Sequence, residues 1–260
     1  MKVIGVIPAR GGSKGILNKN LQRVGGHTLI ERTIEYALMS NLLDAVVLSS
    51  DSDLILKSRK FRDSLILDEK SGSRNLEPLV PSGLAEKPLY RHKRSEILSN
   101  DYSRIADTLF ELHRLLMKVH GSHEYSFLLL QPTSPFRKVT EIDEFLRKHY
   151  KDSKSHAVSV KRVQDAHPAR MYKGENGVLT NLGIFREEEF APRQILSPIF
   201  HRDGGYYLIP EDQILAKIPV GTNPSYSIRE FPYTLNIDEP QDLLLANALI
   251  KDGLFEDNLK

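Results

Sequence analysis

The chain has 260 residues, with 36 lysines and arginines against 34 aspartates and glutamates, and this near balance gives no reason to expect nucleic acid or an anionic membrane as a partner. It contains no cysteine, which excludes disulfides and cysteine-ligated metals. Its apolar stretches are too short for a signal peptide or a membrane-spanning helix, so we expect a cytoplasmic protein.

Short apolar runs alternate with stretches of helical periodicity along the chain. Runs typical of buried strands occupy 3–7, 45–51, 127–130, 156–163, 204–210 and 233–238. Apolar residues recur with helical spacing at 29–40 and 239–251. This alternation predicts an α/β fold, with a mostly parallel, doubly wound Rossmann-like sheet in a single domain spanning residues 1–260.

Two segments interrupt this pattern. Residues 61–93 contain Pro78, Pro81 and Pro88 and are predicted to form an irregular insertion. Residues 161–202 are predicted to form a small protruding subdomain, in which Asn176-Gly177 is the tip of a hairpin.

A cationic, glycine-rich loop follows the first predicted strand, with the sequence "IPARGGSKGILNKN" at 7–20. Its glycines and cations are Gly11, Gly12, Gly15, Arg10, Lys14 and Lys19. Glycines let several backbone N–H groups point at one anion, and we expect the following helix to add its positive end. The spacing fits neither a P-loop nor a GxGxxG dinucleotide loop. The loop therefore predicts a triphosphate site, against the alternative of an ordinary turn with solvated lysines.

This loop resembles the signature of the CMP-sialic acid synthetase (acylneuraminate cytidylyltransferase) family. Further segments match the family in order: "VVLSSD", "RSEILSND", "LLLQPTSPFR", His167-Pro168, "PRQILSPIFHRDGGYYLI" and "NIDEPQDL". The resemblance implies a nucleotidyltransferase that joins CTP to the anomeric hydroxyl of a nonulosonic, sialic-type 2-keto sugar acid and releases pyrophosphate. It also implies a homodimer, with 161–202 as a dimerisation subdomain reaching across to the partner's sugar site.

The expected nucleotide-binding residues lie in the loop and in the "RSEILSND" segment. They are Arg10, Gly11, Gly12, Ser13, Lys14, Lys19, Asn20, Arg94 and Asp101. The resemblance implies that Arg10, Lys14 and Lys19 are the catalytic cations, because phosphoryl transfer depends mostly on positioning and charge neutralisation. Asn20 has the alternative role of a helix cap, and Arg94 that of a solvated surface arginine.

The expected sugar-binding residues lie further along the chain. Gln131 follows a buried strand, where its amide can both donate and accept hydrogen bonds; the alternative is a polar residue that only caps a turn. The resemblance implies that Arg193 meets the sugar carboxylate or the neighbouring nucleotide. His201 stands where the family has an arginine, and Arg202 beside it is the alternative source of charge.

The family places two aspartates at i and i+2, where they hold Mg²⁺. Here that pair is Asn236 and Asp238, so the spacing is kept and one charge is lost. We expect both residues to ligate Mg²⁺ together with phosphate oxygens. The alternative is that Asp238 only caps the last helix.

Three other functions stay open. The chain could be a CMP-Kdo synthetase or a sugar-1-phosphate nucleotidyltransferase. The departures at Asn236, His201 and "DYSRIAD" also allow a catalytically impaired nucleotide-binding regulator.

Overall fold

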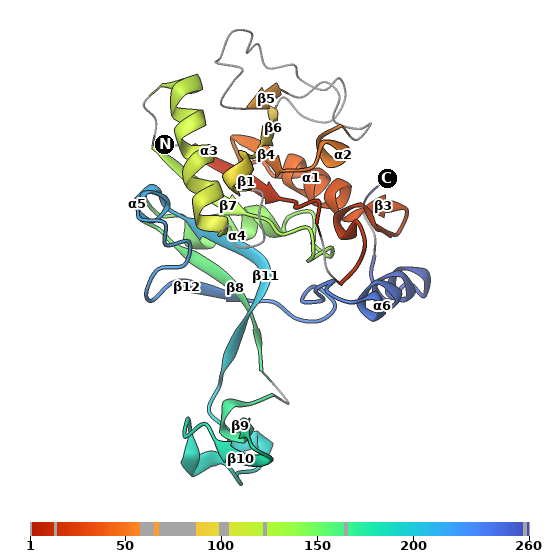
Figure 1. The fold of residues 1–260 in the computed structure, drawn as a ribbon, viewed down its shortest axis with the longest axis vertical. Helices are drawn as coiled ribbons and strands as arrows, with labels where there is room; N and C mark the ends of the chain where they lie inside the picture. The colour runs from red at the N-terminus through yellow and green to blue at the C-terminus, as the bar shows by residue number, and fades with distance from the viewer. Residues whose placement is uncertain are drawn as a thin grey trace.

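An eight-stranded sheet forms the centre of the computed structural model (Figure 1). The structure describes residues 2–12, 15–57, 65–67, 87–98, 104–121, 124–163, 166–256 and 259. In spatial order the strands are β12 (Ser225–Ile228), β8 (Ala157–Arg162), β11 (Phe200–Ile209), β7 (Tyr125–Leu129), β1 (Lys2–Pro8), β4 (Ala45–Ser50), β6 (Leu89–Lys93) and β5 (Leu65–Leu67). Neighbouring strands run parallel except where β11 meets β7 and β8. The predicted mostly parallel sheet is confirmed.

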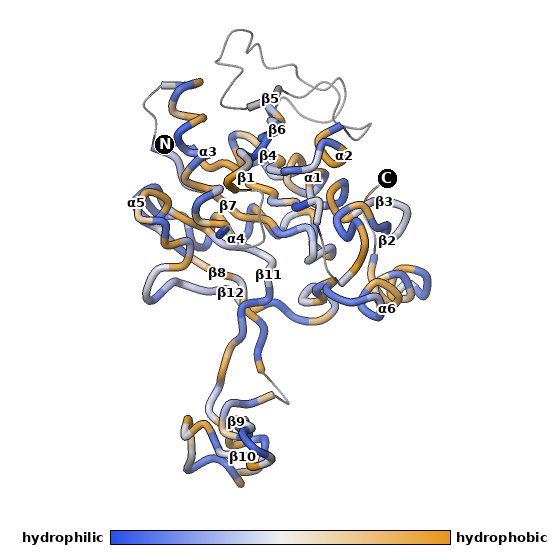
Figure 2. Tube along the Cα trace, in the orientation of Figure 1, coloured by the Kyte–Doolittle hydropathy of each residue, from blue (hydrophilic) through white to orange (hydrophobic). Residues whose placement is uncertain are grey.

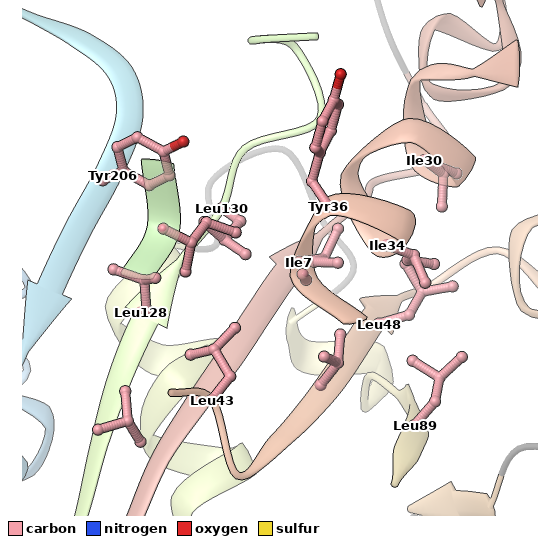
Figure 3. Close-up of a cluster of buried hydrophobic side chains, with 14 of the residues drawn as sticks. Ile7, Ile30, Ile34, Tyr36, Leu43, Leu48, Leu89, Leu128, Leu130 and Tyr206 are labelled. Carbon is pink, nitrogen blue, oxygen red and sulfur yellow. The ribbon is translucent and has the colours of Figure 1, made fainter. Parts of the chain in front are cut away.

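Helices cover both faces of this sheet. On one face, α1 (Leu29–Met39) and α4 (Glu141–His149) pack against alternate residues of the inner strands, including Ile7 and Leu128 (Figure 3). On the other face, α3 (Ile105–His120) and α5 (Glu211–Leu215) pack against Val6 and Leu129. Figure 2 shows β1 as one of the most hydrophobic stretches, as expected for a strand buried on both faces. The doubly wound arrangement is therefore also confirmed.

A third apolar cluster lies under the glycine-rich loop. It joins Ile16 of the loop to Phe136, to Ile237 and to α6 (Pro240–Lys251). A two-stranded hairpin of β2 (Arg23–Val24) and β3 (His27–Thr28) lies beside α6. The remaining described helices are α2 (Asp53–Leu56) and the 3-10 turns at Lys19–Leu21, Glu96–Leu98, Pro168–Arg170, Arg186–Glu188 and Arg193–Ile195.

A thin arm projects from the sheet. Strands β8 and β11 continue together beyond the body as a stalk, which carries a hairpin of β9 (Tyr172–Glu175) and β10 (Val178–Asn181) at its far end (Figure 1). Asn176 and Gly177 have φ of 51° and 79°, which confirms the predicted hairpin tip. We call the described residues of 161–202 the arm.

Some details of local structure differ from expectation. Residues 61–93 were expected to be irregular, yet their described part contains β5 and β6; 61–64 and 68–86 lie outside the described residues. Residues 233–238 form turns and extended chain without strand pairing. The helix expected at 29–40 is confirmed as α1, but a 3-10 turn and a hairpin separate its start from the loop. Strand β12 was not predicted.

Candidate active site

The carboxyl ends of four parallel strands meet at one edge of the sheet. The strands β1, β4, β6 and β7 are adjacent, in the order β7, β1, β4, β6. Arg10 follows β1, Asp51 follows β4, Arg94 follows β6 and Gln131 follows β7. Ligands of open α/β sheets bind at this edge, so the fold itself brings these polar residues together.

Contacts with distant segments shape the glycine-rich loop. The Gly11 N–H donates to Asp51 Oδ1 at 2.8 Å, and Asn20 Nδ2 donates to the Arg10 carbonyl at 2.9 Å. A Cβ on Gly15 would lie 2.7 Å from the Asp238 carbonyl oxygen, so only glycine fits there. The loop is therefore held at its start by β4 and near its middle by the chain before α6.

A pocket of about 380 Å³ lies inside this edge. Among the predicted residues, it is lined by Arg10, Gly12, Lys19, Asn20, Arg94 and Gln131. Pro8, Ile105, Thr108, Pro132 and Thr133 complete its wall. Residues predicted separately for phosphate, base and sugar thus face one common space.

Arg94 is almost fully buried at 6% exposure. Its Nε donates to Ser49 Oγ at 3.1 Å, and its Nη2 donates to the Ser49 carbonyl at 3.2 Å. Burial lowers the pKa of Arg94 to about 10, with the Asp51 carboxylate opposing this shift and the Arg10 charge adding to it. Arg94 is therefore a fixed cation at neutral pH, and the surface-arginine alternative is wrong.

Lys19 reaches the expected metal ligands. Its Nζ lies 3.0 Å from Asp238 Oδ1, in an ion pair whose carboxylate side chain is 62% exposed. The Asn236 amide donates to the other carboxylate oxygen of Asp238. Asn236 Oδ1 is buried and has no hydrogen-bond partner among the described residues. The last helix is capped by Asp242 instead, whose Oδ2 accepts from the N–H groups of Asp238 and Glu239.

Buried arginines stabilise the loop that contains Gln131. Arg137 is fully buried and donates to the carbonyls of Ser134, Gln131 and Gly205, at 2.5, 3.0 and 3.4 Å. Gly204 has φ of 80°, and a Cβ there would lie 2.8 Å from Gln131 Oε1. Gly204 thus leaves open the space that Gln131 faces.

A second buried arginine, Arg229, connects three elements around this loop. Its Nε lies 2.8 Å from Glu141 Oε1 on α4, and its Nη1 lies 3.0 Å from Asp203 Oδ2 on β11. Burial acts against its charge, but Tyr206, Glu141 and Asp203 together raise the pKa of Arg229. This guanidinium stays charged and fixes α4 against β11.

The other predicted site residues are not part of this pocket. Arg193, His201 and Arg202 are exposed on the arm, where Arg193 and His201 line separate hollows. Ser13, Lys14 and Asp101 lie outside the described residues.

Sequence reasoning missed several residues around the pocket. Asp51 was visible at the end of the "VVLSSD" strand, and its position beside the loop could have been predicted from the strand order alone. Ser49, His92 and Glu111 gave no such signal, because isolated polar residues in strands and helices are usually structural.

Comparisons with known proteins agree with this geometry. A family model described as "Cytidylyltransferase" matches residues 4–60, which include the glycine-rich loop. The CMP-N,N'-diacetyllegionaminic acid synthase of Legionella pneumophila is 29% identical over 255 residues, covering 96% of this chain and 97% of its own. The N-acylneuraminate cytidylyltransferase of Escherichia coli is 28% identical over 94% of this chain and 51% of its own, so that relative is about twice as long. The chain is thus similar to cytidylyltransferases of the CMP-sialic acid synthetase kind over nearly its whole length.

A solved structure extends the comparison to the fold. A CMP-2-keto-3-deoxy-manno-octonic acid synthetase complexed with CTP superposes with a TM-score of 0.61, covering 97% of this chain and 100% of its own. At 15% identity this likeness concerns the fold alone. The matched family model and the named relatives indicate that the chain is a nucleotidyltransferase. No helix among its described residues is long and apolar enough to cross a membrane.

Proposed function

We propose that the protein transfers a cytidylyl group from CTP to the anomeric hydroxyl of a nine-carbon 2-keto sugar acid. The observation that carries this proposal is the single pocket shared by Arg10, Lys19, Arg94 and Gln131. The relatives' names support the class of acceptor, since they include a legionaminic and a neuraminic acid. A cytoplasmic location stays a prediction from the sequence.

In the proposed reaction, the hydroxyl oxygen attacks the α-phosphorus. A new P–O bond forms to the sugar, the hydroxyl releases its proton to solvent, the bond to the β-phosphate breaks, and pyrophosphate leaves. Arg10 and Lys19 neutralise the phosphate charge, and Lys14 and Ser13 stay predictions for the same role. Arg94 contacts the cytosine end and Gln131 the sugar. Such catalysis works mostly through positioning and electrostatic stabilisation.

The residues present fit a Mg²⁺ ion. Asn236 Oδ1 is a buried acceptor without a hydrogen-bond partner among the described residues, and Asp238 offers an exposed carboxylate. Mg²⁺ prefers one or two such oxygen ligands, with phosphates and water filling the rest. Asn236 and Asp238 would hold this ion, which supplies charge neutralisation at the phosphates when bound. No cluster of three His, Cys, Asp or Glu residues occurs in the described part of the chain.

A homodimer is part of the proposal. Arg193, His201 and Arg202 lie on the arm, away from the pocket of their own chain. In the proposed dimer the arm carries these side chains to the partner's sugar site, where the positive charges of Arg193 and Arg202 meet an anionic acceptor. Large apolar side chains exposed on the arm, such as Phe190 at 92%, are consistent with an interface there.

The decisive experiment offers the protein Mg²⁺, each of four nucleoside triphosphates and a panel of keto acids, and follows pyrophosphate. We expect release only with CTP and a nine-carbon acid. Release with the eight-carbon acid Kdo alone would favour the Kdo alternative, and release with a sugar 1-phosphate the other transferase. CTP binding without turnover of any acceptor would favour a regulator.

A further inference from the structure

Two buried side chains and the partly buried Glu111 form a series of hydrogen bonds behind Arg94. Ser49 lies on β4 and His92 lies opposite it in register on β6; both are 0% exposed. Ser49 Oγ is 3.0 Å from His92 Nδ1, and His92 Nε2 is 3.0 Å from Glu111 Oε1 on α3. This series of hydrogen bonds ends at Arg94, whose Nε donates to the same Ser49 oxygen.

The donors and acceptors of these groups allow the following arrangement. Arg94 can only donate, so Ser49 Oγ accepts from it and has its own hydrogen available for His92 Nδ1. With Ser49 donating to Nδ1, His92 carries a hydrogen on Nε2 and donates it to Glu111. Burial tends to raise the pKa of Glu111, but hydrogen bonds from His92 and Ser95 lower it overall, which keeps Glu111 an acceptor.

Arg94 needs such support because of its surroundings. It is buried, and the charge of Arg10 lies close enough to lower its pKa. An arginine has several rotatable bonds, and ordering it costs conformational entropy. Two hydrogen bonds to Ser49, one to the hydroxyl and one to the backbone carbonyl, orient its guanidinium beside the pocket.

We propose that Ser49, His92 and Glu111 are positioning residues that set the affinity for the nucleotide through Arg94. None of the three lines the pocket. Their effect therefore reaches the ligand through the orientation of one guanidinium. This inference rests on the proposed function in one respect, namely that Arg94 contacts the bound nucleotide.

Removing the Ser49 hydroxyl tests the proposal with the smallest change of volume. Ser49→Ala is expected to weaken CTP binding, measured by calorimetry, about tenfold, as for one charge-assisted hydrogen bond. The KM for CTP rises accordingly, while the KM for the sugar acid changes less than about twofold. Ser126→Ala is the matched control, because Ser126 is equally buried on β7 but is not connected to Arg94. Equal weakening by both variants would overturn the proposal.

A double-mutant comparison separates positioning from general destabilisation. In an Arg94→Ala background, Ser49→Ala should weaken CTP binding no further, because the guanidinium that it positions is gone. A purely structural serine would show the same loss in both backgrounds. An unchanged affinity for CTP in Arg94→Ala alone would also overturn the proposal.

Variants at Glu111 provide a second test in case Ser49→Ala does not fold. Glu111→Gln keeps an acceptor oxygen for His92 and should weaken CTP binding less than Glu111→Leu, which removes it. Equal affinities in these two variants would contradict the proposal. If the unaltered protein fails to bind CTP, the proposed function is wrong; the same comparisons are then made with the triphosphate that it does bind.

Discussion

Lys19 takes part in two separate interactions at this site. It lines the pocket and simultaneously pairs with Asp238, a residue 219 positions away in sequence. Its identity as a phosphate cation could be predicted, because cations interleaved with glycines after a first strand point to an anion. Its ion pair could not be predicted, because nothing in the local sequence indicates which distant carboxylate approaches the loop.

Replacing Lys19 tests its role at the phosphates. Lys19→Ala is expected to reduce kcat about 100-fold, as for other groups that stabilise developing charge. The melting temperature should hardly change, since the Asp238 carboxylate of this pair is 62% exposed and solvent screens it. Steady-state kinetics and thermal unfolding provide the measurements, and Lys118→Ala on the exposed side of α3 is the control. A kcat within threefold of the unaltered protein would contradict a catalytic Lys19.

Asn236 allows a test of the metal site that does not depend on turnover. Asn236→Asp replaces the amide that donates to Asp238 by a second carboxylate. Without Mg²⁺ the two like charges should destabilise the protein by about 1 kcal/mol, the loss of one hydrogen bond. With Mg²⁺ the stability should return, and the Mg²⁺ concentration for half-maximal rate should fall.

Thermal unfolding with and without Mg²⁺ measures this difference. Asn236→Ala is the control, because it removes the same donor without adding a charge. If Mg²⁺ restores both variants equally, Asn236 does not touch the ion.

At the scale of secondary structure, the predicted strands locate the pocket more reliably than the individual predicted residues do. The strands β1, β4 and β7 were predicted because their apolar runs are continuous, as in strands covered on both faces. Residues 233–238 were wrongly predicted to form a strand, because polar and apolar residues also alternate in an extended segment that packs only one side against a core. Ile237 is buried under the loop while Asn236 and Asp238 point elsewhere, without any strand partner.

Residues 233–238 approach the glycine-rich loop closely, and this contact gives another prediction. Gly15→Ala would place a Cβ 2.7 Å from the Asp238 carbonyl, whereas Gly12→Ala meets nothing within 4 Å. Forcing an extra carbon against fixed backbone costs about 1–3 kcal/mol. In ligand-free protein, Gly15→Ala should therefore melt several degrees lower than Gly12→Ala. Equal melting temperatures would show that the loop can move away from Asp238.

The buried charges joining α4 to β11 predict a larger effect. Arg229→Ala leaves Glu141 and Asp203 without their cation, and breaking a buried pair typically costs about 3–5 kcal/mol. Lys173→Ala, which removes an exposed pair with Glu175, is the control and should cost less than about 1 kcal/mol. Denaturant unfolding measures both. Similar values for the two variants would contradict a structural role for Arg229.

At the scale of the whole molecule, the arm separates one set of predicted sugar residues from the pocket. The protrusion itself could be predicted, since a hairpin signal interrupts the strand–helix alternation. The direction in which the arm projects could not be predicted, because the path of β8 and β11 beyond the sheet depends on packing that no local sequence pattern indicates. The predicted dimer would resolve the separation by placing each arm at its partner's site.

Mixing two inactive variants tests this arrangement. If Arg193 serves the partner, a mixed dimer of Lys19→Ala and Arg193→Ala chains contains one site with both residues intact. Random exchange then restores about a quarter of the normal number of sites. Pyrophosphate release from the mixture, compared with each variant alone, provides the measurement. No recovery after verified subunit exchange would assign Arg193 to its own chain or to no site.

The contact between Lys19 and Asp238 also has a consequence for biosynthesis. The loop emerges from the ribosome well before its partner segment, which follows 219 residues later. Likewise, β1 pairs with β7, whose residues come more than a hundred positions after it. Contacts so distant in sequence form late in folding. A nascent chain therefore carries its cationic loop long before it has a finished pocket, and tight binding of the triphosphate should appear only after the segment around Asp238 has been made.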